Sequence, residues 1–155
     1  MKNFILFTLI LLTTSCGFEV LKQSELLNFN ITRIETNGDR RINFDLRSKL
    51  QSLSKDTGNK KISLIIETKK NKTIKEKNSK NEITKYLITV NLTIKIVNNE
   101  NNQIQTISLV EEIDYNVSEQ NSQTINNEKQ AVKTVSNLLF DKTIKELSLL
   151  SINDL

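Results

Sequence analysis

Residues 84–96 read Thr-Lys-Tyr-Leu-Ile-Thr-Val-Asn-Leu-Thr-Ile-Lys-Ile, and this stretch decides the fold. Every second residue in it is apolar, and Leu87 is the only apolar residue that interrupts the pattern. A period of two held over this length predicts a β-strand with one buried face and one face toward solvent. Burial on one side is typical of an antiparallel sheet that is covered on a single face. The alternating apolar residues are Tyr86, Ile88, Val90, Leu92, Ile94 and Ile96.

The residues before this strand predict a partner for it. Ile62, Leu64 and Ile66 alternate with other residues, which indicates a strand over about 61–69. A polar, lysine-rich stretch follows at 69–82. This stretch either extends the two strands as a long exposed ribbon or forms a mobile loop.

A further strand is expected after the turn at 98–102. Its apolar residues keep one phase, but Glu111 falls on the same face as they do. A β-bulge near Val110-Glu111 would restore the alternation, so we expect a bulge there. The apolar residues in phase are Ile107, Leu109, Ile113, Tyr115 and Val117.

The N-terminal part predicts a strand followed by a helix. Residues 28–36 form the strand, and Asn37-Gly38-Asp39 is a turn that offers a helix N-cap. Apolar residues then recur at steps of four, four and three, which places them on one face of a helix over 40–53. Gly58 is expected to end this helix in a left-handed conformation. The apolar stripe is Ile42, Leu46, Leu50 and Leu53.

A second helix is predicted from about Asn126 to about Leu150, after a polar loop at 118–125. It carries two apolar stripes on roughly opposite sides. The second stripe is either a contact surface for a partner protein, or the helix bends and both stripes are core. The first stripe is Ala131, Val132, Val135, Leu138 and Leu139, and the second is Phe140, Ile144 and Leu147.

The element order is therefore β-α-β-β-β-α. Two helices on one face of a four-stranded, mainly antiparallel sheet make a two-layer α+β sandwich. No repeat of 20–50 residues and no internal linker divides the chain, so residues 16–155 are expected to form a single α+β domain.

The first sixteen residues predict export and lipidation. Lys2 precedes the apolar run 4–12, small residues occupy 13–15, and Cys16, the only cysteine, follows. This order is typical of a lipoprotein signal peptide over 1–15, although Thr13 stands where Leu is usual. Lipidation of Cys16 would anchor the domain at a membrane surface. The alternative is an ordinary signal peptide with an incidental cysteine.

Charge is unevenly distributed along the chain. The formal net charge is +4, but residues 60–85 hold nine Lys and three Glu. The lysine-rich segment is either an anion contact or a solvated loop, since a chain this rich in Lys, Asn and Ile also reflects an AT-biased genome. Nucleic acid is not the expected partner, because no aromatic residues are interleaved with the lysines.

The residue inventory argues against an enzyme. The chain has no His, and its three Gly cannot build a phosphate-binding loop. Glu111, Glu112 and Asp114 are close in sequence, but strand alternation puts them on different faces. We therefore expect no catalytic residues, no metal site and no cofactor, and a function that depends on binding surfaces.

Several stretches resemble the LPS-assembly lipoprotein family of Gram-negative bacteria, the LptE or RlpB-like family. Cys16-Gly17-Phe18 resembles its usual opening, and Arg40-Arg41 leading into Leu46 and Leu50 resembles its first helix. Residues 84–92 resemble its central strand, without the Arg that usually begins it. Asp114-Tyr115, followed by a polar loop and an Ala-containing helix, resembles the remainder.

The resemblance implies a function and partners. The protein would be anchored on the periplasmic side of the outer membrane and plug an LptD-like β-barrel, the translocon subunit. There it would assist barrel assembly and the passage of lipopolysaccharide (LPS). Another periplasmic lipoprotein, such as an ABC lipid-transport auxiliary subunit or a pilotin-like chaperone, is the alternative. Candidate contacts with LPS phosphates are Lys69, Lys70, Lys72, Lys75 and Lys77, and Phe140, Ile144 and Leu147 are candidates for the barrel contact.

Overall fold

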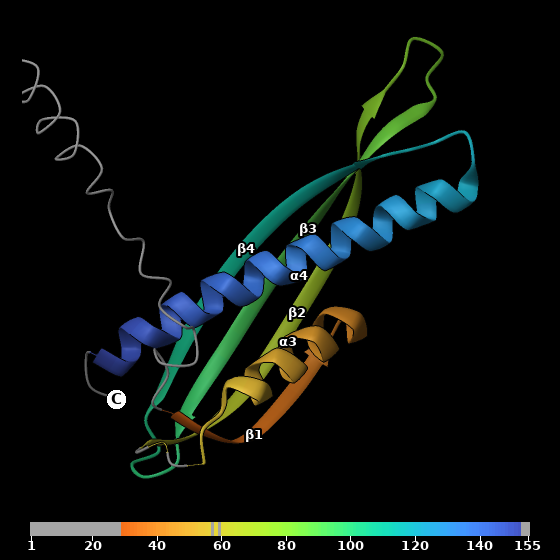
Figure 1. The fold of residues 1–155 in the computed structure, drawn as a ribbon. Helices are drawn as coiled ribbons and strands as arrows, with labels where there is room; N and C mark the ends of the chain where they lie inside the picture. The colour runs from red at the N-terminus through yellow and green to blue at the C-terminus, as the bar shows by residue number, and fades with distance from the viewer. Residues whose placement is uncertain (1–28, 57, 59, 153–155) are drawn as a thin grey trace, which may run out of the picture.

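The computed structural model of the protein describes residues 29–56, 58 and 60–152 (Figure 1). The predicted signal peptide and Cys16 lie outside these residues. The order β-α-β-β-β-α is confirmed, and α4 begins at residue 121 rather than near residue 126. The elements are β1 (Phe29–Gly38), α3 (Arg40–Leu53), β2 (Lys60–Lys77), β3 (Ile83–Asn98), β4 (Ile104–Asn116) and α4 (Asn121–Ile152).

The four strands form one sheet in the order β1-β2-β3-β4. β1 and β2 run parallel, because α3 crosses between them, and the other neighbours are antiparallel. The mainly antiparallel sheet is thus confirmed. β2 and β3 continue well past Thr68, the last β2 residue that pairs with β1. The lysine-rich stretch therefore extends the strands as a ribbon rather than forming a loop.

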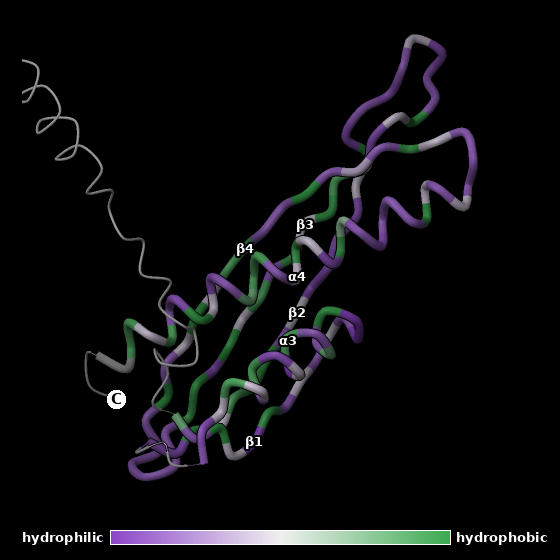
Figure 2. Tube along the Cα trace, in the orientation of Figure 1, coloured by the Kyte–Doolittle hydropathy of each residue, from purple (hydrophilic) through white to green (hydrophobic). Residues whose placement is uncertain are grey.

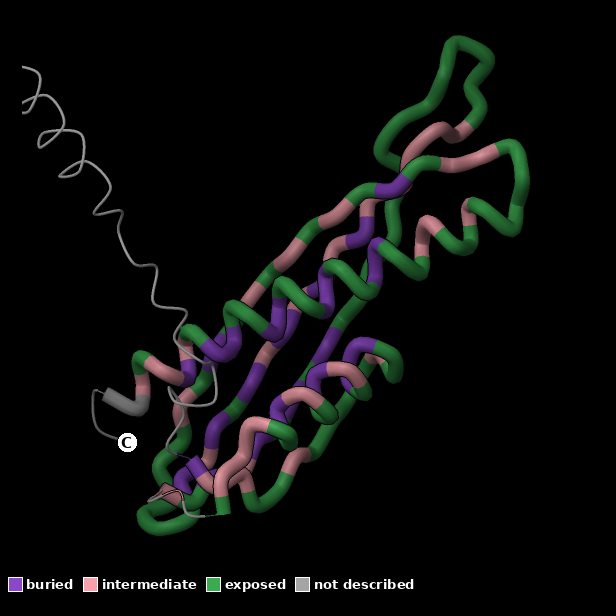
Figure 3. Tube along the Cα trace, in the orientation of Figure 1, coloured by how far each residue is buried: buried purple, intermediate pink, exposed green. Residues whose placement is uncertain are grey.

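Both helices cover one face of the sheet, and the other face is uncovered (Figure 1). The alternating residues of β3 from Ile88 to Ile96 are buried between the layers, as Figures 2 and 3 show along the strand, and Tyr86 is half-buried. The core also takes Ile42, Leu46 and Leu50 from α3 and Ile62, Leu64 and Ile66 from β2. The two-layer α+β sandwich is confirmed.

The predicted bulge in β4 was wrong. The pairing of β3 with β4 runs without a shift from Lys85 opposite Asn116 to Val97 opposite Ile104. Glu111 therefore does lie on the helix-covered face. Its carboxylate is accommodated there because Lys142 of α4 forms an ion pair with it.

The second apolar stripe of α4 is part of the core, which corrects its assignment as an exposed partner surface. Phe140, Ile144 and Leu147 are 8%, 2% and 0% exposed. The reason is the position of α4, which packs on β3 and β4 and also against α3. On the α3 side, Lys49 Nζ lies 5.1 Å from the centre of the Phe140 ring. A helix between two neighbours buries a wide arc of its surface.

α3 begins as the sequence predicts and ends differently. The Asp39 carboxylate accepts hydrogen bonds from the Arg41 and Ile42 amides, both at 3.1 Å, so Asp39 is the N-cap. At the other end Ser54 is the C-cap, in an extended conformation. Gly58 is not left-handed; its small size matters because a Cβ there would lie 2.6 Å from the carbonyl carbon of Phe29.

Candidate functional site

The ribbon formed by the outer halves of β2 and β3 carries the candidate lysines. β4 pairs with β3 as far as Lys85, so only the end of this ribbon, from Lys77 to Ile83, projects beyond the sheet as a two-stranded arm (Figure 1). At its tip, Asn78 Oδ1 accepts hydrogen bonds from the Lys80 and Glu82 amides, both at 3.0 Å. Asn81 has a φ of 63° and closes the turn. The arm therefore ends in an ordered turn.

The base of the arm is held by a cluster around Lys72. Its ammonium lies 2.7 Å from Glu128 Oε2 of α4 and 4.2 Å from the centre of the Tyr86 ring. Tyr115 stacks on Tyr86 with ring centres 5.7 Å apart, and its hydroxyl donates to Glu128 Oε2 at 2.8 Å. We call Lys72, Tyr86, Tyr115 and Glu128 the tyrosine cluster. It ties β2, β3, β4 and α4 together where the sheet narrows into the arm.

Electrostatics in the tyrosine cluster favour the charged forms of the ion pair. The ammonium of Lys72 lowers the pKa of Glu128 below its usual value, against a smaller opposing effect of burial. Burial lowers the pKa of Lys72, but Glu128 and Tyr115 outweigh it, so the pKa of Lys72 is raised. Burial raises the pKa of the Tyr115 phenol.

Two other candidate lysines are also paired within the molecule. Lys70 Nζ lies 2.8 Å from Asp39 Oδ2, and Lys75 Nζ lies 2.8 Å from Asp114 Oδ2. Burial raises the pKa of Asp39, but Lys70 and the amides at the start of α3 outweigh it, so the pKa of Asp39 is lowered. Lys75 lowers the pKa of Asp114 in the same way.

Lys69 and Lys77 differ from the other three candidates. Within the described part of the chain, Lys69 has no hydrogen-bond or ion-pair partner, and Lys77 contacts only the amide oxygen of Asn81, at 3.0 Å. Their positive charges are therefore the ones available to an external anion. The five predicted residues lie along one ribbon, but the structure does not gather them on one face.

Alternation separates the lysines of β2. The buried residues Ile62, Leu64 and Ile66 face the helices, and in this phase Lys70 and Lys72 face the helices too. Lys69 lies on the uncovered face of the sheet. Lys75 reaches that face as well, because its partner Asp114 alternates with the buried Tyr115.

Sequence reasoning did not find the tyrosine cluster. The signal available was that the chain has only two Tyr, both in the apolar phase of neighbouring strands. The strand register places them opposite each other, and Glu128 comes from an element whose position the sequence does not reveal.

The described residues hold no cluster of three or more potential metal-binding acidic, His or Cys side chains. None of the helices in the described part of the chain is long and apolar enough to cross a membrane.

Comparisons with known proteins give a match in structure alone. No protein-family model matches the sequence, and no curated protein matches it. The fold is similar to rare lipoprotein B from Shewanella oneidensis, with a TM-score of 0.55 and 9% identity over 78% of this chain and 97% of that one. It is also similar to a candidate lipoprotein from Caulobacter crescentus, with a TM-score of 0.57 and 12% identity over 84% and 95%.

A third similar structure is the uncharacterized lipoprotein B from Nitrosomonas europaea, with a TM-score of 0.54 and 12% identity over 80% and 87% of the two chains. The class that the architecture defines is thus a two-layer α+β domain shared with small bacterial lipoproteins. More particularly, the chain has the fold of rare lipoprotein B, as the family resemblance of the sequence predicted.

Proposed function

We propose that the protein is an outer-membrane lipoprotein that plugs the β-barrel subunit of the LPS translocon. The observation that carries the proposal is the fold similarity, which spans 97% of rare lipoprotein B. Export and lipidation at Cys16, predicted by the residues around it, would anchor the domain at a membrane surface in the envelope, as a plug of such a barrel requires.

The dimensions of the domain suit a plug. β2 has 18 residues, which at about 3.3 Å per residue is about 60 Å. The apolar band of an outer-membrane barrel is only about 25 Å tall, so the domain is long enough to extend through it. Four strands at about 4.8 Å spacing make a sheet about 15 Å wide, which fits only a large barrel, of the size of those with plugged lumens.

The binding role rests on surfaces rather than on reactive groups. The uncovered sheet face and the arm are available for contact with a barrel wall. Lys69 and Lys77, whose ammonium groups have no carboxylate partner among the described residues, are the first candidates for LPS phosphates. Lys70, Lys72 and Lys75 would have to exchange a carboxylate for a phosphate.

The test is purification of the tagged full chain from the envelope under mild detergent. Recovery of an outer-membrane β-barrel in a stable complex is the expected result. The matched control is Cys16→Ser, which removes the acylation site and should lower the yield of the barrel. Recovery of an inner-membrane ATPase complex instead would contradict the plug and favour an ABC lipid-transport auxiliary subunit.

A direct test of the anchor is mass spectrometry of the native N-terminus. A diacylated Cys16 as the first residue is expected. An unmodified thiol at Cys16, or an N-terminus beyond it, would contradict the lipoprotein assignment.

A further inference from the structure

The outer edge of β4 has backbone groups that no strand of the sheet pairs with. Val117 N–H donates to the Thr84 carbonyl at 2.9 Å, and Asn98 N–H donates to the Gln103 carbonyl at 2.9 Å. These two bonds fix the phase of the antiparallel ladder, so odd-numbered residues of β4 bond to β3. The N–H and C=O groups of the even-numbered residues point away from the sheet. Between the turn and the acidic residues these are Ile104, Thr106, Ser108 and Val110.

Between Ile104 and Val110 this edge lacks the features that normally prevent strand pairing. Sheet edges are usually protected by Lys, Pro, a bulge or a short strand. β4 is 13 residues long, contains no Lys or Pro, and pairs with β3 without a bulge. Residues 101–110 carry no charge at all. Val110 and Ile104 are 56% and 64% exposed.

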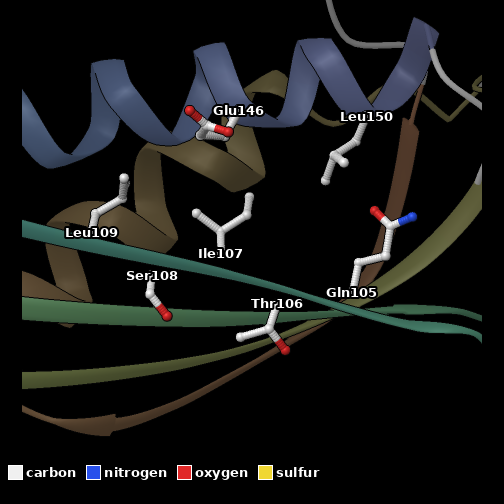
Figure 4. Close-up of a pocket in the computed structure, with 7 residues that line it drawn as sticks. All are labelled: Gln105, Thr106, Ile107, Ser108, Leu109, Glu146 and Leu150. Atoms are coloured by element: carbon white, nitrogen blue, oxygen red, sulfur yellow. The ribbon is translucent and has the colours of Figure 1, made fainter.

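A groove of about 500 Å³ lies beside the same edge, between β4 and the C-terminal part of α4. Figure 4 shows Gln105, Ile107 and Leu109 pointing from β4 toward the helix, with Glu146 and Leu150 on the helix side. The groove is therefore apolar along its floor and has two oxygen-bearing side chains at its rim.

The two polar side chains that face each other across the groove, Gln105 and Glu146, each have an oxygen without a donor among the described residues. The side-chain oxygen of Gln105 is buried without a hydrogen bond. The half-buried carboxylate of Glu146 has no hydrogen-bond or ion-pair partner among the described residues. Buried polar atoms normally have a partner, so the Gln105 oxygen indicates that the occupant supplies a donor there. The negative charge of Glu146 across the groove favours a basic group in the occupant.

We propose that β4 accepts an extended strand from another protein along Ile104–Val110, which adds a fifth strand to the sheet. The incoming strand places alternate apolar side chains over Ile107 and Leu109 and a basic side chain at Glu146. A second copy that pairs through its own β4 does not fit this chemistry, because β4 has no basic residue to bring to Glu146. The inference does not depend on the proposed function, since it specifies a strand and not which protein carries it.

Hydrogen exchange resolved to single residues tests the pairing directly. The amides of Thr106, Ser108 and Val110 should exchange rapidly in the isolated full chain. In the complex that co-purifies from the envelope, they should exchange at least tenfold more slowly. Ile107 and Leu109, which already bond to β3, serve as internal controls and should be protected in both samples.

Four outcomes would overturn the proposal. The even-numbered amides could exchange equally fast in the complex, or they could already be protected in the isolated chain, which would mean that another part of the chain covers the edge. The bound strand could prove to come from a second copy of this chain, or no stable complex could be obtained. These outcomes are distinct from recovery of the wrong partner, which bears on the plug alone.

Substitutions give an independent readout. Ser108→Pro removes an outward donor without touching the β3 ladder and should lower the yield of the complex at least tenfold, whereas Ser108→Ala should leave it unchanged. Glu146→Lys should lower the yield similarly, and Glu119→Lys, the same charge change at an exposed position, should not. Equal yields for each variant and its control would overturn the proposal. If Ser108→Pro fails to fold, the hydrogen-exchange measurement on the unmodified chain tests the proposal in its place.

Discussion

Lys72 of β2 and Glu128 of α4 lie in different layers of the sandwich, yet their charged groups are 2.7 Å apart. The pair joins the sheet to the N-terminal part of α4, one turn before Ala131 and Val132, which are buried. Tyr115 donates to the same carboxylate oxygen, so Glu128 accepts two hydrogen bonds at one atom. We infer that Glu128 fixes α4 against the base of the arm.

Glu128→Gln should destabilise the protein by about 1 kcal/mol. Hydrogen bonds to a charged group contribute about 1.5–3 kcal/mol, but both side chains are more than a third exposed, so solvent screening reduces the effect. Urea unfolding of the purified mature chain measures the loss. Glu35→Gln is the control, because its ion pair with Arg33 lies at the surface with side chains 49% and 72% exposed and should contribute little. Equal losses in the two variants would show that the cluster adds nothing beyond a surface pair.

The same carboxyl should make stability depend on acid pH. The pKa of Glu128 in the folded protein is below its usual value of 4.5, so the unfolded chain binds the proton more tightly. Its contribution is therefore complete above the unfolded pKa and is lost as the pH falls through the folded pKa. Unfolding free energies measured from pH 7 down to pH 3 should fall more steeply in the wild type than in Glu128→Gln. Parallel curves would contradict this.

The fold could be predicted because its signals are local. The alternation in β3 directly reflects which of its side chains are buried, so the strand, its phase and the covered face followed from residues such as Ile88 and Leu92. The prediction of a bulge at Glu111 was wrong because the sequence does not show that Lys142 of α4 lies close enough to pair with Glu111. The sequence left open whether the apolar stripe at Phe140 is core or contact surface for the same reason, since burial there depends on where α4 crosses the sheet.

The candidate site was less predictable than the fold. The sequence located a basic ribbon, but ion pairing in the ribbon depends on residues distant in the chain. Lys70 pairs with a carboxylate 31 positions before it, and Lys72 with one 56 positions after it. Only the assembled layers show that Lys69 and Lys77 are left without a carboxylate partner among the described residues.

Leu147→Ala should cost about 3 kcal/mol, because Leu147 is fully buried and its removal leaves a cavity. Leu138→Ala on the same helix is the matched control, since Leu138 is 40% exposed, and it should cost less than about 1 kcal/mol. Urea unfolding compares the two. If both variants were equally stable, α4 would not be packed in the core as the structure has it.

Gly38→Ala should destabilise the protein by more than about 2 kcal/mol. The φ of Gly38 is 102°, and a Cβ there would lie 1.8 Å from the carbonyl oxygen of Thr68. The backbone would have to move at the point where β1 passes into α3. Asn102→Gly, at a turn residue with a φ of 58°, is the control and should change the unfolding free energy little. A Gly38→Ala variant as stable as wild type would mean that this turn can adopt another conformation.

Charge reversal at Lys69 and Lys77 together should weaken binding of purified LPS about tenfold at low salt. Each exposed ion pair contributes at most about 1 kcal/mol, and tenfold corresponds to about 1.4 kcal/mol. The control is the double variant Lys133→Glu with Lys145→Glu, which changes the net charge equally on the exposed side of α4. A fluorescence titration compares the two. If both double variants lost affinity equally, the effect would come from overall charge, and the ribbon would not be an LPS contact.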